Sequence, residues 1–286
     1  MPDNRRQRAR RHHVVPRFLL RRFANDRGEI FVADHAKREG FITSIENAAI
    51  ETDFYGIDVE GEDEDHFERR LADIESAAAL SLPRLLSADH DDEDRDNVFA
   101  FIAIQATRGP VFRDRLAAFE RMRAETRRQI AAEDHEAIAR FLRSEGGNEP
   151  TTVDVNAFAS DLLRAGLAVD IPREYSVVSA LIAASDLLSQ MGGLQVFVLE
   201  CPKYTFVTSD NPVLLPFPPT AEQRLSVQEC GLAIAVDPHR MLFAVPRRPT
   251  DLADLDCTEL RRRLYTSTKA AARRFTYCHP ALPIDH

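Results

Sequence analysis

The chain has few lysines, no closely spaced cysteines and no long uncharged apolar segment. Three lysines stand against 34 arginines among its 286 residues. No uncharged apolar run reaches the ~18 residues that a membrane-spanning helix needs, so the sequence predicts no membrane partner. The N-terminus lacks the apolar core of a secretory signal, and a cytoplasmic location is therefore expected.

Cysteine spacing gives no support for a zinc ribbon or a thioredoxin-like redox motif. Both kinds of site need a C-x-x-C pair, and the sequence contains none. We expect the four cysteines to be buried, reduced thiols that behave as small apolar side chains. They are Cys201, Cys230, Cys257 and Cys278.

Charge is divided by position along the chain. The first 28 residues carry nine arginines against Asp3 and Asp26, a balance of +7, and since the whole chain carries −9, the other 258 residues carry −16. The sequence predicts a single domain, residues 1–286, with a basic arm at residues 1–11 that need not be ordered. Such an arm could bind the phosphates of a nucleotide or nucleic acid, or form an intramolecular ion-pair clamp. Aromatic side chains for base stacking are absent from residues 1–17, and the pattern does not indicate an oligomeric state.

Hydrophobic periodicity predicts a helical middle between two groups of strands. Alternation predicts strands at residues 29–34, 40–45, 52–59, 194–199, 204–208, 231–236 and 241–245. The helical period predicts helices at residues 16–24, 65–87, 98–106, 111–133, 135–144, 155–168, 174–191 and 257–274. Strands grouped at both ends predict an α+β fold, in which a predominantly helical middle packs with a small antiparallel sheet formed from the N-terminal and C-terminal segments.

The two adjacent histidines, His12 and His13, resemble the histidine-containing opening of HNH nucleases. In those nucleases one histidine is a general base, and a later asparagine and histidine orient and ligate a metal. Asn25 and His35 follow at similar distances. The HNH fold needs a helix at its last histidine, however, whereas residues 29–33 alternate like a strand, so an HNH site is not favoured.

A set of motifs in a fixed order gives a broader resemblance. The motifs are HHVVPRFLLRRFA from His12, ETDFY from Glu51, a helix bearing Glu68 and Glu75, RGP from Arg108 and FVTSDNPV from Phe206. Together they resemble the uncharacterised bacterial domain-of-unknown-function family 4238, which opens with a histidine and a proline and has a late Thr-Ser-Asp-Asn-Pro motif. The resemblance implies membership and no reaction. Gly109 stands where that family has a threonine, so this chain lacks a hydroxyl there.

The polar residues of these motifs suggest a hydrolytic site. Carboxylates and a histidine in one cleft could hold a divalent metal and activate water for attack on a phosphodiester or nucleotide. The catalytic candidates are His13 as general base, Arg108 as anion contact, and Glu68 and Asp210. The candidate metal ligands are Glu68, Glu75 and Asp210. The candidate binding residues are His12, Arg17, Glu51, Asp53, Tyr55 and Asn211.

A non-enzymatic regulatory or interaction protein is the alternative, with the same residues in structural roles. An Asp-Asn-Pro sequence after a strand is typical of an Asx turn. Glu68 and Arg108 could form a buried ion pair between helices. A third hypothesis, hydrolysis with Ser209 as the nucleophile, is weaker because Ser209 lacks the flanking glycines of a nucleophile elbow.

Overall fold

The computed structural model describes residues 11–52, 66–146, 149–164, 169–201, 206–215, 227–247 and 257–282. Its contacts divide the chain into two compact units. The larger unit contains residues 1–112 and 173–286, and the smaller unit contains residues 113–172. Within the part of the chain that the structure describes, no helix is both long enough and apolar enough to cross a membrane. Most of the predicted basic arm, residues 1–10, lies outside the described residues.

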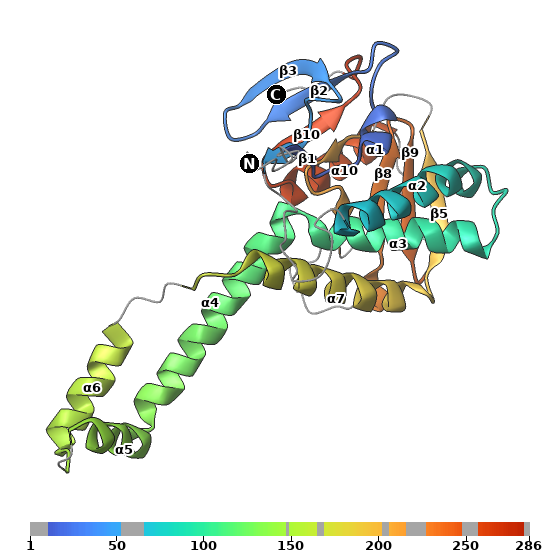
Figure 1. The fold of residues 1–286 in the computed structure, drawn as a ribbon. Coiled ribbons are helices and arrows are strands. Elements are labelled where there is room, and N and C mark those ends of the chain that lie inside the picture. The colour runs from blue at the N-terminus through green and yellow to red at the C-terminus, as the bar shows by residue number, and fades with distance from the viewer. Residues whose placement is uncertain are drawn as a thin grey trace, which may run out of the picture. The chain divides into compact units, whose positions relative to one another are not determined.

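One sheet of the larger unit joins the two ends of the chain. Its strand order is β3-β2-β10-β6, and every neighbouring pair is antiparallel (Figure 1). This arrangement confirms the predicted α+β class and the antiparallel sheet from N-terminal and C-terminal segments. The strands are β2 (Glu29–Asp34), β3 (Glu39–Ser44), β6 (Thr208–Ser209) and β10 (Phe275–Cys278).

A second antiparallel sheet and a short strand pair complete the β-structure of this unit. The second sheet has the order β5-β9-β8-β7, and all six residues of β8 are buried, as its almost wholly apolar sequence predicts. Its strands are β5 (Gln195–Glu200), β7 (Val213–Leu214), β8 (Leu232–Asp237) and β9 (Arg240–Val245). The separate pair consists of β1 (Arg11–His13) and β4 (Ile50–Thr52).

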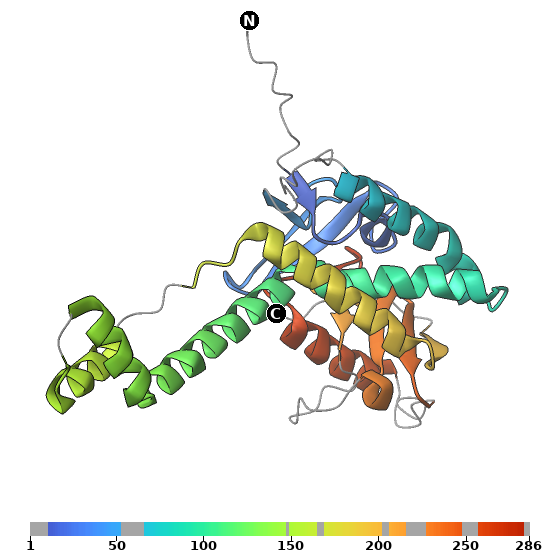
Figure 2. The same cartoon turned by 60° about the horizontal axis from the view of Figure 1, so that its bottom comes forward.

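Helix α3 is central to the helical layer, and it contacts both α2 and α7 (Figure 1, Figure 2). Its N-terminus is capped by Asp91, whose carboxylate accepts the amide of Asp94 at 2.9 Å. The side chains of Phe99 and Ile102 are buried in the main core. The described helices of this unit are α1 (Arg17–Arg21), α2 (His66–Leu86), α3 (Asp92–Arg108), α7 (Arg173–Met191), α8 (Val227–Cys230) and α10 (Cys257–Ala271).

The smaller unit has a small apolar core. It contains most of α4 (Pro110–Glu133), together with α5 (His135–Gly146) and α6 (Thr152–Arg164). Among its described residues, the buried apolar side chains of this core are Ala132, Ile138, Val155 and Ala159.

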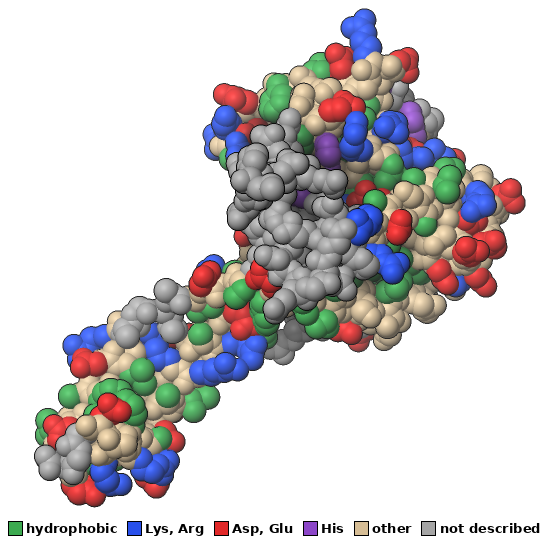
Figure 3. Space-filling view, viewed as in Figure 1, with side chains coloured by type: hydrophobic (Ala, Val, Ile, Leu, Met, Phe, Trp, Pro, Cys, Tyr) green, Lys and Arg blue, Asp and Glu red, His purple; other side chains and the backbone are tan. Residues whose placement is uncertain are grey.

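The face of α4 that periodicity predicts to be buried is only partly covered. Phe112, Leu116, Phe119 and Met122 form this predicted inner face. Phe112 and Leu116 are half-buried. Phe119 and Met122 are 50% and 57% exposed, so the prediction is wrong for these two residues, and hydrophobic side chains lie at the surface of this unit (Figure 3). Periodicity identifies an apolar face but does not show whether another element packs against it.

The thiol prediction is confirmed for Cys201 and Cys278, which are buried and form no disulfide bond among the described residues. Cys230 is free but only partly buried, so the prediction of burial is wrong at this position. Cys230 ends the short helix α8, directly before the loop residue Gly231, and this position gives its side chain partial access to solvent. The side chain of Cys257 lies outside the described residues.

An ion pair fastens the end of β2 to the start of β10 and gives a pH prediction. Arg274 donates to both carboxylate oxygens of Asp34, at 3.0 and 2.6 Å, and lowers the pKa of Asp34 from 3.8 to about 2. A lowered carboxyl pKa stabilises the folded protein above the unfolded value, and this contribution disappears as the pH falls toward the folded value. Asp34→Asn should therefore flatten the loss of stability between about pH 4 and pH 2, the range spanned by the two pKa values.

Urea unfolding at a series of pH values measures this slope. Glu39→Gln is the matched control, because Glu39 is the register partner of Asp34 on β3 and is exposed. We expect the control to keep the parental slope. An Asp34→Asn slope equal to the parental one would contradict the role given to this ion pair.

Candidate functional site

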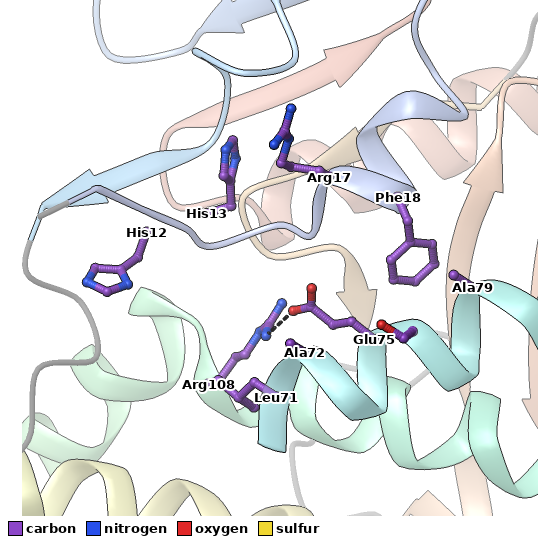
Figure 4. A pocket seen from close by; sticks show the side chains of 10 residues that line it. His12, His13, Arg17, Phe18, Leu71, Ala72, Glu75, Ala79 and Arg108 are labelled. Carbon is purple, nitrogen blue, oxygen red and sulfur yellow. Dashed lines mark hydrogen bonds and ion pairs between the residues drawn. The ribbon is translucent and has the colours of Figure 1, made fainter. Parts of the chain in front are cut away.

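Several of the predicted polar residues surround one cavity of the larger unit, here called the helix cavity. It has a volume of about 340 Å³ and lies between β1, α1, α2 and the end of α3 (Figure 4). Five predicted residues line it, and they are His12, His13, Arg17, Glu75 and Arg108. The apolar part of the lining includes Phe18 and Leu71.

Arg108 is the buried charge of the helix cavity. Its side chain is only 4% exposed, and its Nη1 donates to Oε1 of Glu75 at 2.6 Å. Its Nε and Nη2 both donate to Oε1 of Gln105, at 3.0 and 2.7 Å. A guanidinium has about five N–H donors, so two remain without an acceptor among the described residues. These two donors could bind an anion in the cavity.

Gln105 connects this charge to the histidine segment. It is fully buried, and its Nε2 donates to the carbonyl oxygen of Val14 at 2.8 Å. The contact fixes β1 against the C-terminal end of α3. This role of Gln105 was not predicted from the sequence. A lone glutamine in an apolar run, three residues before an arginine, is the signal that could have indicated it.

The two histidines reach the helix cavity from a strand. In the β1–β4 pair, His12 is opposite Glu51 and His13 is opposite Ile50. Successive strand residues point to opposite sides, and the two imidazoles point in different directions in Figure 4. Both side chains are half-buried and line the cavity, so either one could exchange a proton with a ligand there.

Arg17 has a surface partner. Its Nη2 lies 2.8 Å from Oε1 of Glu46, and both side chains are about half exposed. Such exposed pairs contribute about 0 to 1 kcal/mol. Arg17 can therefore turn toward an anion in the helix cavity at little cost in stability.

Asp210 and Glu51 lie at a different cavity, here called the sheet cavity. Its volume is about 620 Å³, and it lies over the β3-β2-β10 part of the first sheet. Oδ1 of Asp210 accepts the amide of Arg273 at 2.8 Å, and Oδ2 accepts the amides of Arg274 and Phe275 at 2.8 and 2.9 Å. Burial raises the pKa of Asp210, and these amides act in the opposite direction.

The neighbouring asparagine also has a structural contact. Nδ2 of Asn211 donates to the carbonyl oxygen of Ala271 at 2.9 Å, at the end of α10. The hydroxyl of Ser209 donates to the carbonyl oxygen of Asn211 at 2.8 Å. This contact is local to the turn and does not resemble the exposed serine of a nucleophile elbow. Asp210 and Asn211 therefore join β6 to the turn between α10 and β10.

The proposed metal ligands do not form one cluster in the described part of the chain. Among those residues, no group of three or more histidine, cysteine, aspartate or glutamate side chains could hold a metal ion. Glu75 lines the helix cavity, whereas Asp210 lines the sheet cavity. Glu68 belongs to α2, but its side chain lies outside the described residues, as do Asp53 and Tyr55.

Comparison with known proteins identifies the family. A family model described as "Protein of unknown function (DUF4238)" matches residues 11–255. The chain belongs to the DUF4238 family. Neither the search of curated proteins nor the search of solved structures gave a match. The DUF4238 match includes the whole lining of the helix cavity, whereas the Arg273–Tyr277 wall of the sheet cavity lies beyond it.

Proposed function

We propose that the helix cavity binds a phosphoester of a nucleotide or nucleic acid and hydrolyses it. The observation that carries this proposal is Arg108, a buried cation with two N–H donors that no described residue accepts, beside the two half-buried imidazoles of His12 and His13. Arginine donors suit phosphate oxygens, and an imidazole can remove a proton from attacking water. With Arg17, the cavity has two arginines against one carboxylate, that of Glu75.

Each of these residues has a distinct role in the proposal. His13 is the general base, and His12 contacts the leaving group of the phosphoester. Arg108 neutralises a phosphate oxygen, and Glu75 holds the guanidinium in position. Mg²⁺ is commonly held by one or two carboxylates together with substrate phosphates, so Glu75 and the bound phosphate could share a divalent cation.

The basic arm supports an anionic substrate. The arginines of residues 5–10 directly precede β1, the strand that carries His12 and His13 to the helix cavity. Arginines on such an arm would increase the affinity for a polyanion, with a strong dependence on salt. We propose that a nucleic acid or nucleotide is the partner that this arm contacts.

A cleavage assay tests the hydrolytic role. The substrates are bis(4-nitrophenyl) phosphate and a labelled single-stranded oligonucleotide, with Mg²⁺, with Mn²⁺ and with EDTA. His13→Ala should lower the cleavage rate about a hundredfold or more, because general-base catalysis contributes on this scale. His90→Ala is the control, since His90 is exposed on the loop between α2 and α3.

Two outcomes of the assay would contradict the proposal. Parental cleavage by His13→Ala would exclude His13 as the base. No cleavage by the parental protein under any of the metal conditions would favour the non-enzymatic hypothesis. The hydrogen bonds of Gln105, Asp210 and Asn211 are the structural contacts that the non-enzymatic hypothesis expects of such residues.

A further inference from the structure

We propose that the sheet cavity is a second binding site, for a small aromatic amine that also carries a hydroxyl or carbonyl oxygen. This site is separate from the helix cavity, and the inference does not depend on phosphoester hydrolysis. At about 620 Å³, the sheet cavity falls in the range of about 300 to 1,000 Å³ that is usual for small-molecule sites.

The floor of the sheet cavity is aromatic and apolar. Phe41, Val32 and Tyr277 lie in register across β3, β2 and β10, so their side chains share one face of the sheet. Phe275, two residues before Tyr277, lies on the same face, and the centroids of these two rings are 6.5 Å apart. Phe41 is 47% exposed although it lines the cavity. A planar apolar ligand would cover this surface.

Tyr277 gives the floor a polar group. The residue is 1% exposed and lines the cavity, yet its hydroxyl forms no hydrogen bond with the described residues. Burial raises the pKa of Tyr277 well above its usual value, and the nearby negative charges of Asp210 and Glu51 raise it further. The hydroxyl therefore stays protonated and can donate to an oxygen of the ligand. Buried tyrosine hydroxyls usually have such a partner.

The charges around the cavity select for a cation. Arg273 pairs with Glu51 at 3.2 Å, and Arg274 pairs with Asp34 at 2.6 Å. Asp210 has no ion pair of its own among the described residues, although Arg273 and Arg274 interact with its charge at longer range. Around the cavity the carboxylates of Asp34, Glu51 and Asp210 therefore outnumber the two guanidinium groups. Oδ1 of Asp210 accepts one amide whereas its Oδ2 accepts two, so Oδ1 can accept one further donor. An ammonium group suits this position.

These features define a ligand with three parts. An aromatic ring covers Phe41 and Val32, an ammonium group donates to Asp210, and an oxygen accepts the hydrogen bond of Tyr277. Phenylalaninol has all three parts. 3-Phenyllactate is the comparison, because it keeps the ring and the carbon skeleton but carries no cation. Its hydroxyl stands where phenylalaninol has the ammonium group, and its carboxylate stands where phenylalaninol has the hydroxymethyl group.

Binding of these two probes tests the proposal. Calorimetric or NMR titration of the full chain should show saturable binding of phenylalaninol and at least about tenfold weaker binding of 3-phenyllactate, a difference typical of one charged contact. Phe41→Ala and Tyr277→Phe should each weaken phenylalaninol binding about fivefold or more. Ile42→Ala is the control, because Ile42 is exposed on the opposite face of β3.

The result of this binding test does not depend on whether the helix cavity is a hydrolytic site. His13→Ala should bind phenylalaninol like the parental protein, whether or not the helix cavity hydrolyses a phosphoester. Lack of saturable binding, equal affinity for 3-phenyllactate, or parental affinity in the folded Phe41→Ala variant would each overturn the proposal. The exposure of Phe41 makes a folding defect in that variant a minor risk, and far-UV circular dichroism checks it.

Discussion

Asp210→Ala is expected to lower the free energy of unfolding by about 3 to 5 kcal/mol. The carboxylate of Asp210 is the acceptor for three consecutive backbone amides at the start of β10. Alanine removes this acceptor and leaves the amides of Arg273, Arg274 and Phe275 without it. An unsatisfied buried donor costs about 1 to 3 kcal/mol, and water that enters the sheet cavity would reduce the sum.

Denaturant unfolding of two variants measures this effect. Asp210→Asn is the matched control, because its amide oxygen can still accept part of the amide set, and a loss of about 1 to 2 kcal/mol is expected. The alanine variant should be clearly less stable than the asparagine variant. Equal stability of Asp210→Ala and the parental protein would show that these hydrogen bonds do not hold β10 in place.

Arg108→Met should lower the free energy of unfolding by about 3 kcal/mol. The substitution leaves the carboxylate of Glu75, 29% exposed, without its cation, and it leaves the fully buried Oε1 of Gln105 without two donors. Removing one partner of a buried ion pair costs about 3 to 5 kcal/mol, and the partial exposure of Glu75 places the expectation at the lower end.

A double variant separates the ion pair from the glutamine contact. Arg108→Met combined with Glu75→Leu removes both charges and should recover part of the lost stability, since apolar replacements of a buried pair are often tolerated. The remaining deficit measures the contact with Gln105. A double variant less stable than the sum of the two single variants would contradict this description of the pair.

Local patterns in the sequence were sufficient to predict most of the fold. The alternation in residues 29–34 predicted β2 with its observed bounds, and the helical period predicted α2 and α7 within one residue at each end. These elements lie in long or strongly patterned segments, where one face is apolar over several turns or strand residues. The N-terminal and C-terminal grouping of strands then gave the fold class.

The missed strand β10 shows where local patterns fail. Its sequence, Phe275 to Cys278, is four residues long and follows directly after a helix. So short a segment has too few alternating positions to be recognised. It is a strand because β2 and β6 pair with it from distant parts of the chain. Residues of β10 form part of the sheet cavity, so this cavity could not be predicted from the sequence.

The structure brings only some of the predicted site residues to one cavity. These residues are His12, His13, Arg17, Glu75 and Arg108. Asp210 and Asn211 do not line it, because their partners are the backbone groups of residues 271–275. The Asx-turn interpretation identified a structural motif there, but these partners lie about sixty residues further along the chain, beyond any local signal.

The most direct test of the proposed phosphoester site is the cleavage rate of His13→Ala relative to the parental protein, measured on the labelled oligonucleotide with Mg²⁺ at equal folded fractions. We predict a rate reduced by about a hundredfold or more, with an unchanged melting temperature. A parental rate in this variant, or a parental protein that cleaves nothing, would contradict the assignment of the helix cavity as a hydrolytic site.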